Sequence, residues 1–138
     1  NEASLKEVVK MIRLYQPKIV ICNSVSDRHQ DHGRGGDLVV RDCFLAGLAK
    51  FKTQYDDHAQ LPTRPVNIFR YIQDRWLQPD FVVDITDQME LKKQSILAFS
   101  SQFFDPNSTE PTTPISGPEF MEFILGRAAQ FGRRINRK

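Results

Sequence analysis

The chain has 138 residues, which suits one domain with a core of moderate size. Hydrophobic residues make up 40% of it and charged residues 26%, as in ordinary globular proteins, and no apolar run approaches the ~20 residues that span a bilayer. The net charge of +2 is too small to indicate binding to nucleic acid or to a membrane surface.

The two cysteines, Cys22 and Cys43, each lie within an apolar segment and form no CxxC pair. We therefore expect buried, reduced thiols and a reducing compartment. No signal-peptide pattern opens the sequence, so we expect a cytoplasmic protein. Residue 1 is Asn rather than Met and a helical pattern follows at once, so we also expect a piece of a longer protein.

The first half of the chain predicts a helix, a strand, a loop and a second helix. Apolar residues recur at helical spacing over residues 4–16 and stop at Pro17. The apolar run within 18–23 predicts a strand buried on both faces, as in parallel sheets. A loop over 24–33 and a helix over about 35–50 follow.

The second half begins with a polar surface excursion over residues 51–65. Alternating residues over 66–71 and an apolar run over 81–85 predict two further strands. A helix over about 87–101 follows an Asp-x-x-Glu cap, and three prolines mark a loop over 105–115.

A capping box from Ser116 to Glu119 introduces a final helix, whose apolar stripe continues to Ile135. Three strands thus alternate with four helices along the chain. This order predicts an α/β fold with a mainly parallel sheet.

Side chains that could form a catalytic or metal site are concentrated in residues 27–36, Asp-Arg-His-Gln-Asp-His-Gly-Arg-Gly-Gly. This stretch holds two of the three histidines. The stretch follows an expected strand and precedes an expected helix. In α/β folds the sites gather outside the carboxyl ends of the strands, and the stretch lies in that place.

Imidazole is a good zinc ligand, and His29 and His32 lie three residues apart. On a helix both rings would face one metal ion; in a loop, one could bind the metal while the other faces a substrate. Asp31 could bind the metal or accept the N–H of a histidine. The glycines that follow allow a sharp turn and leave room for a ligand.

Simpler interpretations stay open at several positions. Asp27 and Arg28 could pair with each other or cap the loop, Arg34 could lie on a helix surface, and His58 lies in a polar loop. A catalytic zinc usually takes three protein ligands, and the stretch offers one or two. Either the site is incomplete in this chain or the stretch is not a metal site.

The chain resembles the LmbE-like, or PIG-L, zinc-dependent N-deacetylases. It is most similar to the branch that deacetylates N-acetylglucosaminyl malate in bacillithiol biosynthesis. The resemblance covers nearly the whole chain, in order, and rests on residues 27–35, 42–48, 78–87, 101–103 and 115–120.

The resemblance implies the C-terminal part of a Rossmann-like three-layer sandwich. It assigns zinc, or another divalent metal, to His32. His29 stabilises the oxyanion or donates a proton to the leaving amine, and Asp31 orients His29. Arg28 or Arg34 could hold the malate carboxylates, because Arg suits bidentate carboxylate contacts.

The same resemblance places the remaining ligands and the general base in an N-terminal Pro-His-Pro-Asp-Asp motif, which these 138 residues lack. We also expect the family's final segment, beyond the last helix, to be cut off after Lys138. We therefore expect a single deacetylase domain over residues 1–138, incomplete at both ends and inactive in isolation. The expected partner is a small amino-sugar conjugate, without nucleic acid or membrane; related proteins often form homo-oligomers.

Two other functions stay open from the sequence. A metal phosphoesterase could use the same Asp-His loop, but it would need a second Asp-rich cluster. A catalytically silent fragment or interaction module would keep the fold without the chemistry.

Overall fold

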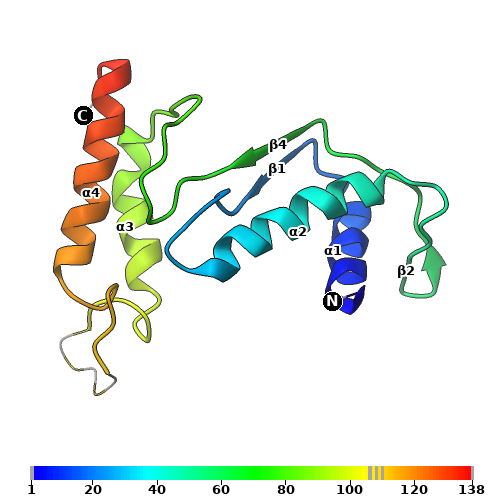
Figure 1. Cartoon of the computed structure of the whole chain (residues 1–138), viewed down its shortest axis with the longest axis horizontal. Coiled ribbons are helices and arrows are strands. Elements are labelled where there is room, and N and C mark those ends of the chain that lie inside the picture. Colours follow the sequence, from blue (N-terminus) through cyan, green and yellow to red (C-terminus); the bar gives the residue numbers. More distant parts are fainter. Residues whose placement is uncertain (1, 106, 108, 110, 138) are drawn as a thin grey trace. The chain divides into compact units, whose positions relative to one another are not determined.

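The computed structural model describes residues 2–105, 107, 109 and 111–137. The chain forms two compact units, residues 1–78 and residues 79–138. Helices and a parallel strand pair confirm the expected α/β class (Figure 1). No helix in the described ranges has the length and apolar character needed to cross a membrane. The expectation of a single, incomplete domain stays a prediction.

The first unit contains the parallel sheet and two of the helices. Its elements are α1 (Glu2–Tyr15), β1 (Ile19–Cys22), α2 (Gln30–Ala46), β2 (Gln54–Tyr55), β3 (His58–Ala59) and β4 (Asn67–Arg70). Strands β1 and β4 pair in parallel, with Ile19 opposite Asn67 and Cys22 opposite Arg70. The polar stretch after α2 carries the short antiparallel hairpin β2–β3.

The core of this unit forms where α1 packs on α2. The buried stripe of α1 consists of Leu5, Val9 and Ile12, which meet Cys43 and Ala46 of α2. Burial of one such aliphatic side chain contributes about 1.5–3 kcal/mol. The helical spacing in the sequence therefore identified this stripe correctly, and both cysteines are buried and free as expected.

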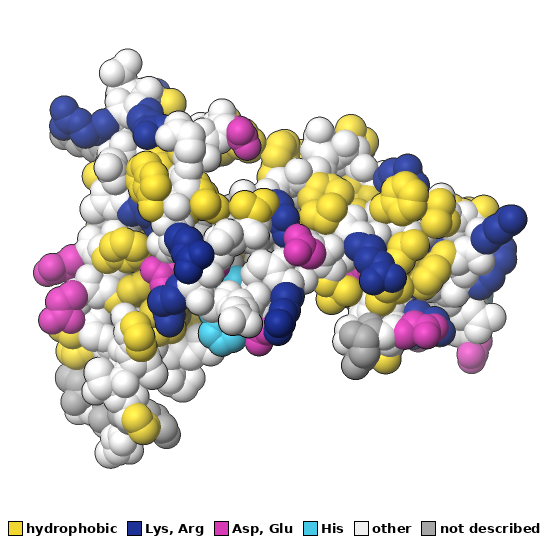
Figure 2. All heavy atoms as spheres, in the orientation of Figure 1, with side chains coloured by type: hydrophobic (Ala, Val, Ile, Leu, Met, Phe, Trp, Pro, Cys, Tyr) yellow, Lys and Arg dark blue, Asp and Glu magenta, His cyan; other side chains and the backbone are white. Residues whose placement is uncertain are grey.

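The two faces of the sheet differ in burial. Val20 and Ile68 pack against the core between the helices. Ile19 and Ile21 point the other way and are 54% and 67% exposed. The expected burial of this strand on both faces is wrong, because α1 and α2 cover one face only; hydrophobic side chains remain visible over this region in Figure 2.

Arg13 of α1 is buried and holds the C-terminal end of α2. Its guanidinium donates, at 2.7–3.0 Å, to the carbonyls of Ala46, Leu48 and Phe51 and to the hydroxyl of Thr53. A cation near the last carbonyls of a helix also suits the negative end of the helix dipole. The arrangement anchors α2 at the end opposite to its histidines.

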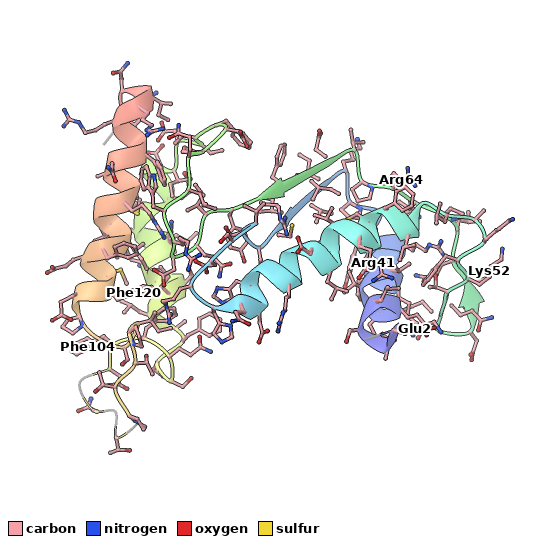
Figure 3. The ribbon with its side chains drawn as sticks, viewed as in Figure 1. Glu2, Arg41, Lys52, Arg64, Phe104 and Phe120 are labelled. Carbon is pink, nitrogen blue, oxygen red and sulfur yellow. The ribbon has the colours of Figure 1, made fainter. Side chains whose placement is uncertain are left out.

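Arg64 covers the same end of α2 from outside, and Figure 3 shows it beside that part of the helix. Its Nη2 donates to the Phe44 carbonyl at 3.1 Å, and its guanidinium lies 4.6 Å from the centre of the Phe44 ring. A Cβ at Gly47 would lie only 2.6 Å from Nε of Arg64. Glycine at this position therefore lets Arg64 approach the helix end.

The second unit is helical in its described residues. It contains the 3-10 turn η1 (Thr86–Gln88), α3 (Met89–Leu97), α4 (Glu119–Gly132) and a 3-10 turn η2 (Arg133–Ile135). The final helix is confirmed, whereas α3 ends before the predicted residue 101. The predicted capping boxes are wrong, since neither helix has a side-chain cap.

The strand expected over 81–85 is also wrong: these residues pair with no other strand in the described structure. Asp84 instead organises a turn, because its Oδ1 accepts the N–H and the hydroxyl of Thr86 at 3.0 and 2.6 Å. Its Oδ2 pairs with Nε of Arg137 at 2.8 Å. The loop expected over 105–115 includes residues 106, 108 and 110, which lie outside the described residues.

Candidate metal and catalytic site

The candidate site lies where the two parallel strands end. Because β1 and β4 are parallel, residues 23–29 and 71–75 leave the sheet at the same edge (Figure 1). The side chain of Asn23 donates to that of Gln73 at 2.9 Å, which ties the two loops together. The stretch singled out in the sequence therefore faces a second loop, from a distant part of the chain.

Helix α2 begins at Gln30, five residues before the predicted start. His29 takes the N-cap position with an extended backbone, and its Nδ1 accepts the N–H of Asp31 at 3.3 Å. Histidine is not among the favoured N-cap residues, so the sequence pattern gave no reason to begin the helix here. The consequence is that His32 lies in the first turn of α2 instead of in a loop.

Gly36 lets α2 pass close to the loop that follows β1. A Cβ at Gly36 would lie 2.6 Å from the Asn23 carbonyl oxygen. Arg70, at the end of β4, donates from Nε to this same carbonyl at 3.1 Å and from Nη2 to Asp37 at 2.7 Å. The first turns of α2 are thus held against both strand ends.

Asp27 is the most connected side chain of the site, and it is fully buried. Its Oδ2 contacts Nδ1 of His32, and its Oδ1 accepts the backbone N–H groups of Asp74 and Arg75 at 3.1 and 2.8 Å. Burial alone would raise the pKa of this carboxyl, but the hydrogen bonds from Arg75, His32 and neighbouring amides outweigh it and lower the pKa to about 2. Asp27 is therefore an ionised acceptor at neutral pH.

The two imidazoles lie beside each other, with ring centres 5.3 Å apart and planes at 34°. Because a carboxylate engages Nδ1 of His32, that nitrogen carries the proton and Nε2 keeps its lone pair. His29 has the opposite arrangement, because its Nδ1 accepts an N–H and its proton lies on Nε2. Histidine is visible at the surface in the region where α2 begins (Figure 2).

The other predicted site residues lie nearby, in looser contacts. Asp31 is exposed; its Oδ2 lies 3.9 Å from Nδ1 of His29, and its Oδ1 lies 3.4 Å from Nη1 of Arg34. Arg28 pairs with Asp74 at 2.5 Å. The structure thus brings Asp31 near His29 without a side-chain hydrogen bond, and it directs Arg28 toward the loop after β4.

The part that Asp27 plays did not follow from the sequence, which indicated only a pair with Arg28 or a loop cap. Asp27 lies five residues before His32, a spacing with no distinctive meaning of its own. Its other contacts come from residues 47 and 48 positions later in the chain. No local pattern carries that information.

The site offers one residue that is suited to bind a metal ion, His32. A histidine whose Nδ1 donates to a buried carboxylate is the usual arrangement around a bound metal, with Nε2 as the ligand atom. His32 meets that description. In the ranges that the structure describes, no group of three His, Cys, Asp or Glu side chains is placed to hold a metal ion, so a three-ligand zinc site needs donors from elsewhere.

The chain is similar to known proteins both in sequence and in structure. The chain is 31% identical over 101 residues to the diacetylchitobiose deacetylase of Thermococcus kodakarensis, which is 71% of this chain and 37% of that protein. The structure of the chain is similar to that of a conserved protein from Thermus thermophilus, with a TM-score of 0.79 and 24% identity over 96% of this chain and 53% of the other. No protein family model matches the sequence.

These similarities differ in what they establish. The structural likeness shows the fold, and it agrees with the α/β class. The sequence likeness is to a deacetylase, and this chain spans little more than a third of that protein's length. The chain is therefore similar to part of a deacetylase, and its structure is similar to about half of the Thermus thermophilus protein.

Proposed function

We propose that this chain supplies one side of the active site of a metal-dependent N-deacetylase of the LmbE-like family. The reaction is hydrolysis of the N-acetyl group of an N-acetylglucosamine conjugate. The carrying observation is the pair of adjacent imidazoles at the end of the parallel sheet: Nδ1 of His32 contacts the Asp27 carboxylate, and Nδ1 of His29 accepts the N–H of Asp31. These contacts imply an acceptor at Nε2 of His32 and a donor at Nε2 of His29. The sequence likeness to a diacetylchitobiose deacetylase supports this reaction class.

His32 is the proposed metal ligand of this chain, through Nε2. A zinc ion held there would polarise the acetamide carbonyl and lower the pKa of a water molecule. The Asp27 carboxylate holds the ring of His32 in place through its hydrogen bond with Nδ1. The Asp27 side chain is fully buried, which excludes water from this hydrogen bond. The other ligands and the base that takes the water proton are proposed to lie outside residues 1–138.

His29 is the proposed acid of the reaction. Its Nδ1 accepts the amide N–H of Asp31, so its own N–H is on Nε2, and the side chain is 58% exposed. As the amide carbon becomes tetrahedral, this N–H would stabilise the negative oxygen. To pass a proton to the leaving nitrogen, the ring would first take up a second proton on Nδ1 and would then return to its neutral form. Cleavage of the C–N bond then gives acetate and the free amine.

The substrate is proposed to be a small amino-sugar conjugate, with N-acetylglucosaminyl malate as the leading candidate. Arg34 is exposed and bound only loosely to Asp31, at 3.4 Å. It is therefore better placed than Arg28, which already pairs with Asp74, to meet a carboxylate of the conjugate. We further propose a cytoplasmic enzyme.

Acetate release from N-acetylglucosaminyl malate and from diacetylchitobiose, by the whole protein that contains this chain, tests the proposal. His32→Ala should lose bound zinc and turnover, whereas His29→Ala should keep zinc and lose about 10²–10⁴-fold in rate. His58→Ala is the matched control, because His58 lies on the exposed hairpin strand β3. Zinc-free wild-type protein without acetate release would instead favour a silent interaction module.

A further inference from the structure

We infer that Asp27 is a positioning residue that fixes the tautomer of His32, with the proton on Nδ1 and the lone pair on Nε2. The inference assigns to Asp27 a role that neither the sequence pattern nor the likeness to known proteins indicated. Its importance for metal binding depends on the proposed function, but the tautomer itself does not.

The hydrogen bonds of Asp27 allow only one position for the proton on the His32 ring, Nδ1. Oδ1 is committed to two backbone N–H groups, those of Asp74 and Arg75. Oδ2 faces Nδ1 of His32. A carboxylate can only accept, so the shared proton of this last contact must come from the ring. Free histidine in water favours the proton on Nε2, so Asp27 reverses the intrinsic preference.

The burial of Asp27 strengthens its hydrogen bond to His32 and therefore its effect on the tautomer. The Asp27 side chain is fully shielded from solvent, whereas the His32 side chain is 36% exposed. Water therefore does not compete for the carboxylate. A charge-assisted hydrogen bond in such a place is roughly twice as strong as a neutral one.

Asp27 also ties the ring to both strands of the sheet. It follows β1 in the chain and accepts hydrogen bonds from the loop after β4. Arg28 strengthens the same connection through its ion pair with Asp74. The position of the His32 ring is consequently set by the sheet edge as well as by helix α2.

Asp31 provides the natural contrast. It lies next to His32 in sequence, but its side chain is 70% exposed and contacts His29 and Arg34 at 3.9 and 3.4 Å. Nothing in the described structure connects its carboxylate to the ring of His32. Its replacement by Asn should therefore leave the His32 tautomer unchanged.

Asp27→Asn is the sharpest variant because it changes one atom of the carboxyl group. The two backbone N–H groups still need an acceptor, so the Asn carbonyl oxygen must take the Oδ1 position. The amide nitrogen then faces Nδ1 of His32 and donates to it. That reverses the tautomer: Nδ1 becomes the acceptor, and the proton moves to Nε2, where it blocks a metal.

Long-range ¹H–¹⁵N correlation spectra of the 138-residue chain, recorded above the titration range of histidine, report the protonated nitrogen of each ring. We expect Nδ1–H for His32 in the wild type and in Asp31→Asn, and Nε2–H in Asp27→Asn. A wild-type ring protonated on Nε2 overturns the inference, and so does an Asp27→Asn ring still protonated on Nδ1. The wild-type spectrum decides the matter even if the variant folds poorly.

Zinc affinity of the whole protein gives a second measurement. Loss of a residue that hydrogen-bonds to a metal ligand weakens metal binding by about 10–100-fold, so Asp27→Asn should show a decrease of that size. Asp57→Asn, in the exposed turn between β2 and β3, should show none. Active wild-type enzyme with His32 protonated on Nε2 would refute this inference alone. The expected tautomers without any acetate release would refute the proposed function alone.

Discussion

Nε of Arg13 in α1 donates to the carbonyl of Ala46, the last residue of α2, at 3.0 Å. This bond belongs to a buried set that includes the carbonyls of Leu48 and Phe51. Arg13→Met keeps the aliphatic stem and removes every donor. The carbonyls of Ala46 and Leu48 keep a backbone N–H, those of Thr63 and Phe51, so the variant loses hydrogen bonds without leaving these two acceptors bare. Each lost hydrogen bond costs about 0.5–1.5 kcal/mol, so we expect a loss of about 3 kcal/mol in the free energy of unfolding.

Urea denaturation of the chain, followed by circular dichroism, measures this loss. Lys6→Met is the matched control, because Lys6 lies on the exposed side of α1 and pairs with Glu2 at 3.0 Å in solvent. Such a pair contributes less than about 1 kcal/mol. Equal unfolding midpoints for the two variants would contradict the role given to Arg13.

Asp42 should make the stability of the chain fall as the pH rises. It is completely buried in α2, and neither carboxylate oxygen has a hydrogen-bond partner among the described residues. Burial raises its pKa from 3.8 to about 6, although the charge of Arg41 acts in the opposite direction. The folded chain therefore binds a proton more tightly than the unfolded chain does.

Below pH 4 this stabilisation is fully present, and it is lost as the pH rises through about 6. The shift corresponds to roughly 3 kcal/mol. Asp42→Asn should remove the slope and raise the unfolding midpoint at pH 8. Thermal unfolding between pH 4 and pH 8 checks this, with Asp31→Asn as an exposed control on the same helix. A slope that survives in Asp42→Asn would contradict the assignment.

Replacement by alanine should change the stability of the chain in opposite directions at Gly35 and Gly36, two neighbouring glycines of α2. Alanine stabilises a helix interior by about 1 kcal/mol relative to glycine. At Gly35 the nearest atom to an added Cβ is Oδ1 of Asn23, at 3.8 Å, so Gly35→Ala should stabilise the chain. At Gly36 the added Cβ would lie 2.6 Å from the Asn23 carbonyl oxygen.

Gly36→Ala should therefore destabilise the chain by more than about 1 kcal/mol despite its better helix propensity, as overpacking usually does. It should also disturb the loop before α2, which amide chemical shifts of residues 23–29 would reveal. If both variants were equally stable, the close approach of α2 to the strand end would not hold in solution.

The sequence predicted the elements whose signals are local. The stripe of Leu5, Val9 and Ile12 needs only helical spacing, and the run at β1 needs only β-branched residues. The start of α2 escaped prediction because His29 caps it through a ring nitrogen. The apolar run over 81–85 gave no strand because a strand exists only with a partner, and here Asp84 forms a turn.

The roles given to the site residues stay predictions, and the connections of the site did not follow from the sequence. His29, Asp31 and His32 were singled out because their side-chain types are rare together in so short a stretch. The hydrogen bonds of Asp27 join residues 47 and 48 positions apart, so they follow from the parallel pairing of β1 with β4. The assignment of a metal to His32 stays a prediction.

Anomalous diffraction at the zinc edge, from crystals of the whole protein grown with zinc, tests the central claim most directly. The account predicts a zinc peak bonded to Nε2 of His32, with Nδ1 still against Asp27 and with His29 beside the metal and unbound. It also predicts that the peak disappears in His32→Ala and persists in His58→Ala. A zinc peak away from His32, or one that survives in His32→Ala, would contradict the proposed deacetylase site.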